Sequence, residues 1–400
     1  YSLIYEYVEG NARLAKEQML KLGLSADFDK IKFTLDEDVR KRLLLTLKDF
    51  DNRKLLYRDY KIVNYSPKYQ TTFSGLEIKY KQEQSKLYHI AYKIGEEQII
   101  VATTRPETIF GDTAIAINPS NELFKHLVNK LAKIPLTDRE IPIIIDQLVD
   151  SDFGTGAVKV TPAHDALDWQ IAQKHNLPRL NLLDKDGLLS ENVPERYIGL
   201  TTTEARKKIV NELKESGALV KEENYTHQVA YTSKGDDKIE PILMKQWFIR
   251  MKDFARKLIE DLENNLVDFK PIGFKNSLIN WLENIEDWNI SRQIVWGIRL
   301  PIYYSKNNME KYFVGEAEEA KEYFKNEEFY QDSDVLDTWF SSGHWPLVTL
   351  GYPSKLWDEF APTDLMVTGK EIIFLWVSRM IMLSSDIAGK IPFKTVYING

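Results

Sequence analysis

Two short stretches of this sequence carry polar side chains of the kind that do chemistry. The first, GAVKVTPAHDALDW at 156–169, reads as a buried strand that is followed at once by His164, Asp165 and Asp168. The second, VATTRPETIFGDTAIAINP at 101–119, ends a strand in two threonines, an arginine and a proline. Hydroxyl groups and a guanidinium beside two carboxylates make a polar pocket that could hold an ammonium group, a hydroxyl group and an attacking water.

The residues themselves leave three interpretations open: a metal site, a hydrolytic site and a helix cap. Asp165 and Asp168 are three positions apart at the start of a predicted helix, so both carboxylates lie on one face near its positive end. For Asp165 alone, capping is the simplest interpretation, because aspartate is a preferred N-cap. A triad of His164 with Thr103 or Thr104 is disfavoured, because the neighbouring side chains at 164 and 165 diverge.

The composition narrows the possible classes of protein. The 400 residues include no cysteine and six histidines, and no histidine pair has the spacing of a zinc hydrolase, so no metal is expected. The formal net charge of -7 disfavours a protein that binds nucleic acid through net positive charge, so an RNA partner would be bound locally. The longest apolar run, 372–377 with a continuation at 380–383, is far shorter than the ~20 residues that span a bilayer. It predicts a buried helix.

The chain shows no signal peptide, so a cytoplasmic protein without membrane partners is expected. It does not begin with Met, and we therefore expect it to be an internal piece of a longer protein.

The elements that must position the polar residues follow from periodicity. Residues 85–230 show short strands broken by Gly, Pro and Asp, with helices at 165–175 and 203–217, which predicts a compact β-rich domain. Before this domain, residues 11–22 and 36–56 have helix periodicity and predict a helical lead-in. The turn-rich stretch 61–80 that follows predicts a hinge. After Glu240, helices rich in Trp and Arg, such as SLINWLENIEDWNISRQIVWG, alternate with short strands, as in an α/β nucleotide-binding half. The charged stretch 306–333 is expected to be a solvated insertion.

Five motifs, in order and over nearly the whole chain, resemble those of the class I valyl-tRNA synthetases: TTRPET, GTGAVKVTPAHD, DWNISRQIVWG, DVLDTWFSS and VTGKEIIFLWVSRM. The forms TPAHD, DTWFSS and IIFLW favour the valyl over the isoleucyl relatives. The resemblance implies an α/β fold in which a Rossmann-type class I synthetase catalytic domain, present in part, is interrupted by a β-barrel-like editing domain. It places the catalytic domain at 1–79 and 236–400 and the editing domain at 80–235.

The same resemblance implies that the full-length protein attaches valine to tRNA(Val) with ATP and Mg²⁺, as a monomer. It implies that the inserted domain hydrolyses mischarged threonyl-tRNA(Val). No cofactor and no zinc are expected on this fragment. The alternatives are a fragment of an isoleucyl-tRNA synthetase and a non-catalytic tRNA-binding or trans-editing module. Motifs of the catalytic half on both flanks disfavour a standalone editor.

The resemblance also assigns residues to the editing pocket. Asp168 is expected to hold the ammonium group or the threonine hydroxyl, and Lys159 to steady an oxyanion or a backbone phosphate unless it is an ordinary surface lysine. The water would attack with no metal and no enzyme nucleophile, so catalysis would rest on positioning. The matching catalytic positions are Asp168, Asp165, Lys159 and Thr161, and the matching substrate-binding positions are Thr103, Thr104, Arg105, Phe153 and His164.

A second group of positions matches the synthetic site. The valine site is matched by Asp27, Tyr303 and Trp339, and the adenosine site by Thr368, Gly369 and Glu371. A turn aspartate and core aromatic residues are the plain alternatives for the valine positions. Glu371 stands where relatives carry Asp, which leaves the length of its hydrogen bond open.

Two departures from the family pattern carry further expectations. Many relatives have paired cysteines where this chain has Ser66, Tyr69, Thr232 and Gly235, so zinc is not expected. Neither a HIGH-type motif nor a KMSKS loop occurs in the chain, so the chemistry of ATP is expected to be incomplete in this piece.

Overall fold

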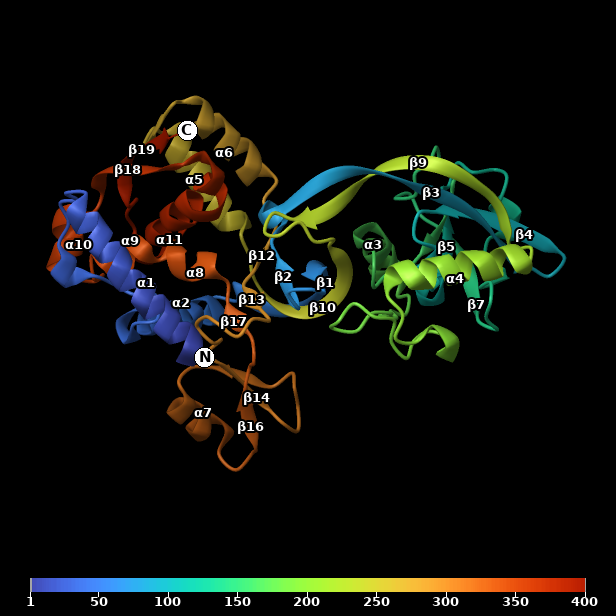
Figure 1. The fold of residues 1–400 in the computed structure, drawn as a ribbon, viewed down its shortest axis with the longest axis horizontal. Coiled ribbons are helices and arrows are strands. Elements are labelled where there is room, and N and C mark those ends of the chain that lie inside the picture. The colour runs from blue at the N-terminus through green and yellow to red at the C-terminus, as the bar shows by residue number, and fades with distance from the viewer. Residues whose placement is uncertain (1, 400) are drawn as a thin grey trace. The chain divides into compact units, whose positions relative to one another are not determined.

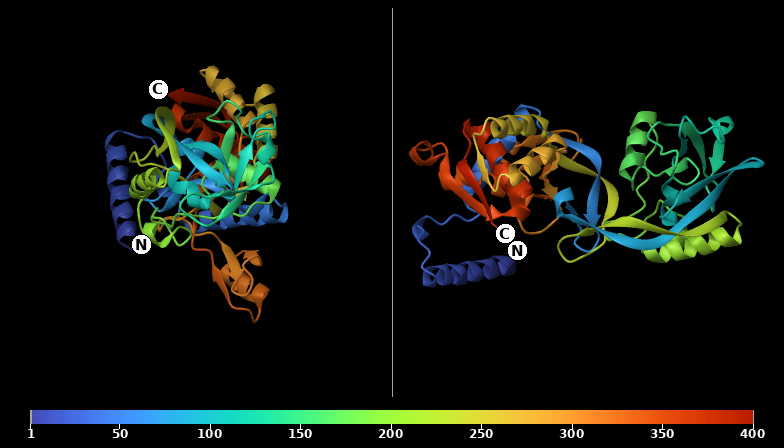
Figure 2. Two further views of the ribbon diagram at one scale, coloured as in Figure 1. Left: turned by 90° about the vertical axis from the view of Figure 1, so that its right-hand side faces the viewer. Right: turned by 90° about the horizontal axis from the view of Figure 1, so that it is seen from above.

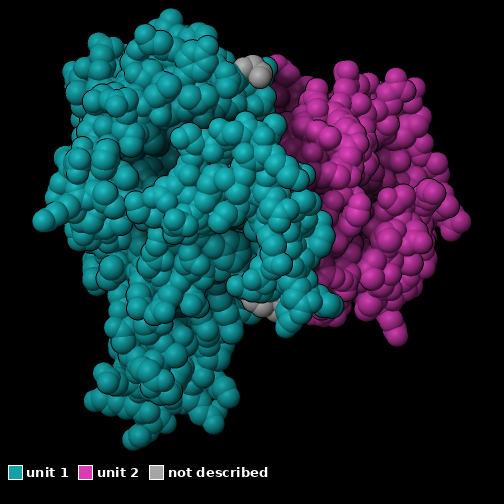
Figure 3. All heavy atoms as spheres, turned by 60° about the vertical axis from the view of Figure 1, so that its left-hand side comes forward, with its two compact units in different colours: residues 1–58, 246–400 teal, residues 59–245 magenta. Residues whose placement is uncertain are grey.

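The structure is a computed structural model that describes residues 2–399, and it divides the chain into two compact units (Figure 3). Unit 1 comprises the chain up to Arg58 and again from Gln246, and unit 2 comprises Asp59–Lys245. The chain leaves unit 1 within strand β1 (Leu56–Ser66) and returns within β10 (Glu240–Ile249). Unit 2 is therefore inserted into unit 1.

The insertion extends beyond the expected borders at 80 and 235. Tyr65 and Ile242 belong to the buried core of unit 2. The Tyr65 hydroxyl also donates to the carbonyl of Lys185 at 2.7 Å. Residues 59–79 and 236–245, which the sequence assigned to the catalytic domain, therefore pack with unit 2, because their apolar side chains are removed from water there.

Unit 1 contains a parallel sheet with the strand order β11–β19–β18, drawn in Figures 1 and 2. These strands span Asp268–Lys270, Phe393–Asn399 and Thr363–Gly369, and helix α11 (Ser378–Ala388) lies between β18 and β19 in the chain. Because β18 and β19 are parallel, their carboxyl ends meet at one edge, where α/β folds bind ligands. Unit 1 has the α/β character that the sequence predicts.

The other helices and strands of unit 1 come before or between the strands of this sheet along the chain. Its helices are α1 (Ser2–Lys21), α2 (Glu37–Asn52), α5 (Lys252–Glu263), α6 (Gly273–Glu283), α7 (Ala317–Phe324), α8 (Thr338–Gly343), α9 (Trp345–Thr349) and α10 (Lys355–Phe360). Its short strands are β12 (Trp288–Asn289), β13 (Ser291–Arg292), β14 (Ile302–Ser305), β15 (Tyr312–Val314), β16 (Phe329–Gln331) and β17 (Val335–Leu336). The apolar run at 372–383 is helical, through a π-helical turn at Ile373–Val377 and the start of α11, with Val377 and Met380 buried. Within residues 2–399, no helix is both long enough and apolar enough to cross a membrane.

The Trp-rich segment that the sequence predicts as helical is helical only in its first part. Helix α6 ends at Glu283, and the chain continues into the short strands β12 and β13. These strands pair antiparallel with β10 and β17. The Trp288 indole N–H donates to the carboxylate of Asp337 at 2.8 Å. Such tertiary contacts hold an extended backbone that helix periodicity does not foresee.

The charged stretch 306–333, which the sequence predicts to be a solvated insertion, is folded, and most of its charged side chains are exposed. It contains β15, α7 and β16, and its two strands pair with the preceding strand β14 in the order β15–β14–β16. Tyr303, Ala320 and Phe324 are buried in a small core of their own. The apolar residues between the charges are spaced to form this core, which a count of charges does not reveal.

Unit 2 is built on a sheet with the order β4–β3–β6–β7–β5–β8, and β9 pairs along β3 as a long ribbon (Figure 1). Its strands, besides parts of β1 and β10, are β2 (Thr71–Phe73), β3 (Ile78–Ile94), β4 (Glu97–Thr103), β5 (Ala114–Ile117), β6 (Leu131–Lys133), β7 (Glu140–Ile145), β8 (Ala157–Val160) and β9 (Leu219–Thr232). β5 and β7 pair parallel. The end strands β4 and β8 contact each other, so the sheet curls into a half-barrel.

The helices of unit 2 lie where the sequence predicts them. Helix α3 spans Ala166–His175 and begins at the N-cap Asp165. Helix α4 spans Thr202–Glu215 and begins with a capping box formed by Thr201 and Glu204. These local signals fix the helix starts, and the start of α3 sets the position of the first candidate stretch.

The positions where relatives carry cysteines lie together in unit 2 and form hydrogen bonds. The Tyr69 N–H donates to the Ser66 hydroxyl at 3.3 Å, and the Thr232 hydroxyl donates to the Lys234 carbonyl at 2.5 Å. The Tyr69 hydroxyl lies directly against Gly235, so a side chain at 235 would collide with it. Within residues 2–399, no group of three or more His, Cys, Asp and Glu side chains is placed to hold a metal ion.

We expect the purified protein to contain no stoichiometric zinc, because hydroxyl groups and glycine stand in place of the thiolates that would bind zinc at these positions. A chelator is expected to leave the melting temperature unchanged, since a structural metal would contribute folding free energy. Elemental analysis and melting curves with and without EDTA test this. One tightly bound zinc ion per chain would contradict it.

Candidate functional site

A pocket of about 300 Å³ in unit 2 brings the two candidate stretches together. Its lining includes every residue that the sequence assigned to editing: Thr103, Thr104, Arg105, Phe153, Lys159, Thr161, His164, Asp165 and Asp168. Ala102, Thr108, Val149, Asp150, Val158 and Leu167 complete it. The residues come together because β4 and β8 contact each other in the curled sheet and each strand leads into one of the stretches.

The two aspartates at the start of α3 have different environments. Asp165 is exposed and caps the helix, accepting from the N–H groups of Leu167 at 2.8 Å and Asp168 at 3.0 Å. Asp168 accepts from the Thr161 N–H at 2.8 Å through Oδ2. Burial, and after it the nearby negative charge of Asp165, raise the pKa of Asp168 to about 7. Asp165 is thus a cap, whereas Asp168 is a carboxylic acid that changes charge near neutral pH.

Lys159 is buried on β8 and is not a solvated surface residue. Its ammonium donates to the hydroxyl of Thr108 at 2.9 Å and to the carboxylate of Asp112 at 3.2 Å, and also to the hydroxyl of Thr161. Asp112 accepts in addition from the hydroxyls of Thr161 and Tyr92, both at 2.6 Å. Burial raises the pKa of Asp112 above its ordinary value, although the Lys159 charge acts against this. The network holds the lysine ammonium in one place beneath the pocket.

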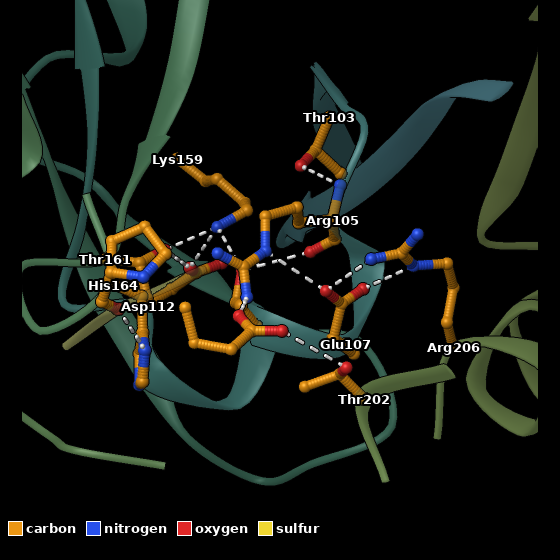
Figure 4. Close-up of polar contacts among 12 residues, drawn as sticks. Thr103, Arg105, Glu107, Asp112, Lys159, Thr161, His164, Thr202 and Arg206 are labelled. Carbon is orange, nitrogen blue, oxygen red and sulfur yellow. Dashed lines mark hydrogen bonds and ion pairs between the residues drawn. The ribbon is translucent and has the colours of Figure 1, made fainter. Parts of the chain in front are cut away.

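Arg105 is held by a second buried network, shown in Figure 4. Its guanidinium donates to Glu107 at 3.1 Å and to Glu240 at 2.5 Å. Glu107 also accepts two hydrogen bonds from Arg206, at 2.8 and 2.7 Å, and lies between the two arginines in Figure 4. Burial raises the pKa of Glu107, but the hydrogen bonds from Arg206 and the charge of Arg105 outweigh this and hold it below its ordinary value. The network orients Arg105 at the pocket wall.

His164 lines the pocket, but both of its ring nitrogens are already engaged. The Leu182 N–H donates to Nε2 at 2.9 Å, so Nδ1 carries the proton and faces the carbonyl of Pro241 at 3.2 Å. Burial, and after it the positive charge of Arg105, lower the pKa of His164 to about 3. The ring is therefore neutral at physiological pH and supports the pocket wall as a fixed part of the structure.

The loop between β7 and β8 needs glycine to approach β4. Gly154 has a φ of +61°, and a Cβ atom there would lie 2.7 Å from the Cβ of Ala102. A larger residue would push the loop from the sheet. Phe153, next to this glycine, packs edge-on against Tyr225 with ring centroids 6.3 Å apart. The GTG sequence thus places Phe153 at the pocket.

The three positions assigned to the valine site lie in different surroundings. Asp27 is an exposed N-cap that pairs with Lys30 at 2.8 Å. Tyr303 packs in the small core of the 306–333 segment, edge-on against Phe329. Trp339 packs against the main core of unit 1. The pocket of about 560 Å³ that Tyr303 lines includes neither of the other two positions.

The positions assigned to adenosine lie at the carboxyl end of β18. Thr368 is buried and pairs with Ile398 of β19. A Cβ atom at Gly369 would lie 2.7 Å from the carboxylate of Glu371, so the glycine lets this carboxylate fold over the strand end. The three positions are thus close together in the chain at the carboxyl edge of the parallel sheet.

Sequence reasoning missed several residues that hold the unit 2 pocket together. Glu107 and Asp112 stand inside the stretch 101–119, one on each side of the apolar pair Ile109 and Phe110, a signal that could have identified them. Arg206 and Glu240 are far away in sequence and look like ordinary helix and strand residues. Only the folded chain brings them to Glu107 and Arg105.

Comparison with known proteins agrees with the motifs. A family model described as tRNA synthetases class I (I, L, M and V) matches residues 2–400. The chain is similar to valine–tRNA ligases from Clostridium perfringens, Geobacillus kaustophilus and Thermotoga maritima, with identities of 43%, 44% and 43% over 99% of this chain. It spans about half of their length, 46%, 45% and 46%.

A solved structure of LeuRS from Agrobacterium radiobacter K84, in a ternary complex with tRNA, is a more remote match. It is 15% identical with a TM-score of 0.43, and the match covers 99% of this chain and 56% of that one. This likeness is too low to support an argument. The family model, in contrast, covers nearly the whole sequence, and the chain therefore belongs to the class I tRNA synthetases.

Proposed function

We propose that this chain is part of a valine–tRNA ligase and that unit 2 hydrolyses threonyl-tRNA(Val). The observation that carries the proposal is the unit 2 pocket, whose lining includes every residue assigned to editing from the sequence. The identity of the amino acid rests on the relatives, which are valine–tRNA ligases.

The polarity of the pocket favours threonine over valine. The two amino acids are nearly isosteric, so an apolar valine pocket separates them weakly, and valyl enzymes are the standard illustration of this limit, at about a hundredfold. A second site with buried polar groups can separate them better, because a methyl group in place of the hydroxyl would leave those groups without a partner. The hydroxyls of Thr103 and Thr104 and the carboxylate of Asp168 provide such groups.

Asp168 and Lys159 have complementary parts in the proposed hydrolysis. Oδ2 of Asp168 is held by the Thr161 N–H, and we assign Oδ1 to the substrate's ammonium or hydroxyl group. The Lys159 ammonium is fixed by its hydrogen bonds and stabilises the negative charge that develops on the ester carbonyl oxygen. Water oxygen bonds to the carbonyl carbon, the ester C–O bond breaks, and the ribose oxygen takes a proton. Threonine and uncharged tRNA are released.

Unit 1 is proposed to carry part of the synthetic site of the whole protein, which joins valine to tRNA(Val) with ATP and Mg²⁺. Thr368, Gly369 and Glu371 would meet the adenosine ribose at the carboxyl end of β18. A Cβ atom at Gly369 would lie 2.7 Å from the Glu371 carboxylate. A side chain at 369 would therefore fill space at the strand end where we propose that the ribose binds. A longer acid in place of aspartate can therefore still reach over the strand end.

The direct test of the editing proposal is deacylation of preformed aminoacyl-tRNA by the purified protein. We expect the protein to hydrolyse threonyl-tRNA(Val) about a hundredfold faster than valyl-tRNA(Val). Such a ratio would add to the weak discrimination between valine and threonine in the synthetic step. Equal rates for both, at the level without protein, would reject the editing assignment.

The rate of deacylation is expected to rise with pH, with a midpoint near 7. The pKa of Asp168 is raised to about 7, so its carboxyl group is mostly neutral at pH 6 and mostly charged at pH 8. Only the charged form attracts an ammonium group. The measurement is kcat/KM for threonyl-tRNA(Val) from pH 5.5 to 8.5, which reports pKa values of the free protein.

Asp168→Asn is the control for this profile, because the amide cannot ionise. The midpoint near pH 7 should disappear in this variant. If it persists, the titrating group is elsewhere, for example on the substrate's own amino group, and the role given to Asp168 is wrong.

A further inference from the structure

Four side chains of unit 2 form a cluster of aromatic rings and cations that the proposed chemistry does not use. The Arg179 guanidinium lies 4.0 Å from the ring centroid of Tyr60 and 5.7 Å from that of Trp169. The Lys245 ammonium lies 5.6 Å from the Tyr60 ring. The four residues come from β1, α3, the segment after α3, and β10. We call Tyr60, Trp169, Arg179 and Lys245 the aromatic-basic patch.

The patch begins one helical turn from the pocket. Asp165 lines the pocket as the N-cap of α3, and Trp169 stands four positions later, donating its N–H to the Asp165 carbonyl at 3.0 Å. Residues four apart lie on the same helix face. Leu167, between them in sequence, lines the pocket and is 41% exposed. A ligand chain that leaves the pocket along this face of α3 therefore meets Trp169 and then Arg179.

Arg179 has no carboxylate partner within residues 2–399. It is exposed, and its contacts within residues 2–399 are with the two rings alone. Arg105, Arg206 and Arg196 each pair with a glutamate. In a chain with a formal net charge of -7, a cation that is not neutralised is available to an anionic ligand.

Planar cations stacked on aromatic rings are suited to single-stranded nucleic acid. Bases stack on aromatic and guanidinium planes, and the cations attract the phosphates. A protein or lipid partner would not need the combination of flat rings and positive charge at the rim of this pocket. We propose that the aromatic-basic patch binds the unpaired nucleotides at the 3′ end of the tRNA while the ester lies in the pocket. This inference rests on the proposed editing function and names the surface that holds the substrate's nucleic acid.

The experiment compares two substrates that carry the same ester. One is threonyl-tRNA(Val), and the other is the threonyl ester of adenosine, which lacks the preceding nucleotides. Arg179→Ala is expected to lower kcat/KM for the tRNA by about tenfold, through KM, which is in the range of losing one stacked base. Hydrolysis of the small ester should stay within about twofold, because Arg179 does not line the pocket. Arg179→Lys should restore only part of the loss, since it keeps the charge but not the plane.

Arg196→Ala is the matched control. Arg196 also stacks on a tyrosine, with its guanidinium 4.6 Å from the Tyr197 ring, but it is paired with Glu212 at 3.0 Å and does not line the pocket. It should leave both substrates unchanged. Melting curves of all variants establish that each is folded.

Each result decides between the possibilities. If Arg179→Ala hydrolyses threonyl-tRNA(Val) at an unchanged rate, the proposed role of the aromatic-basic patch is wrong. An equal loss of activity on both substrates would also contradict it, because it would place Arg179 in the pocket. If the unsubstituted protein hydrolyses neither substrate, the editing function fails, and filter binding of uncharged tRNA(Val) then tests the patch by itself. Binding that Arg179→Ala weakens about tenfold, and Arg196→Ala does not, would support the patch, while equal binding by both variants would overturn it.

Discussion

Asp168→Ala is expected to lower the hydrolysis of threonyl-tRNA(Val) by about a hundredfold or more, with each tenfold corresponding to about 1.4 kcal/mol of lost transition-state stabilisation. The physical reason is the position of the carboxylate, which lines the pocket and is held by the Thr161 N–H at 2.8 Å. Its removal takes away the only negative charge that we assign to the substrate's ammonium group. The measurement is deacylation of preformed threonyl-tRNA(Val), beside a melting curve. Folding is expected to survive, because Asp165, and not Asp168, caps the helix.

Asp165→Ala is the control for Asp168→Ala. Asp165 accepts from two backbone N–H groups of α3, so its loss should cost about 1 kcal/mol of stability. A loss of hydrolysis beyond what this destabilisation explains would give Asp165 a second role at the pocket. If Asp168→Ala clears threonyl-tRNA(Val) as fast as the unsubstituted protein, the carboxylates at this corner are structural and the assignment of the pocket is wrong.

Glu107→Gln is expected to destabilise unit 2 by about 3–5 kcal/mol, the usual cost of breaking a buried ion pair from one side. The Glu107 side chain is 1% exposed and is paired with both Arg105 and Arg206. The neutral amide would leave two partly buried guanidinium groups, of Arg105 and Arg206, with less negative charge beside them. Thermal or urea unfolding followed by circular dichroism measures the change.

Glu122→Gln is the matched control for this loss of charge. Glu122 pairs with Lys125 at 2.9 Å on the surface, and exposed pairs contribute less than about 1 kcal/mol. A similar small effect for Glu107→Gln would mean that the two arginines find other partners. The network around Arg105 would then not be what fixes the pocket wall.

Local sequence signals predicted much of the fold of unit 2. The aspartate at 165 marks a helix start that does not depend on distant contacts, and the helix-period residues at 203–217 predicted α4. The apolar strands of the β-rich region were found for a similar reason, since each is bounded by Gly, Pro or Asp. Where tertiary contacts decide the backbone, the sequence failed: the segment after Glu283 is extended because Trp288 is tied to Asp337.

The spacing of residues in the two stretches, together with the family resemblance, was enough to predict which side chains line the pocket. It could not predict their chemical states. The pKa of Asp168 is raised to about 7 and that of His164 is lowered to about 3, chiefly because the half-buried Asp168 and the buried His164 are shielded from water, and this shielding depends on how the sheet curls. The residue types alone had left Lys159 undecided between a surface and a functional position.

The sequence by itself determined the family and nine of the residues that line the pocket, because motifs are local properties of the chain. The tertiary structure alone decided which charges are paired. Arg206 and Glu240 reach Glu107 and Arg105 only after α4 and β10 have packed on the half-barrel. A buried charge must find a partner in space, whatever its distance along the chain, since water is no longer available to solvate it. For the same reason Arg179, which stays exposed, needs no such partner and remains available to a ligand.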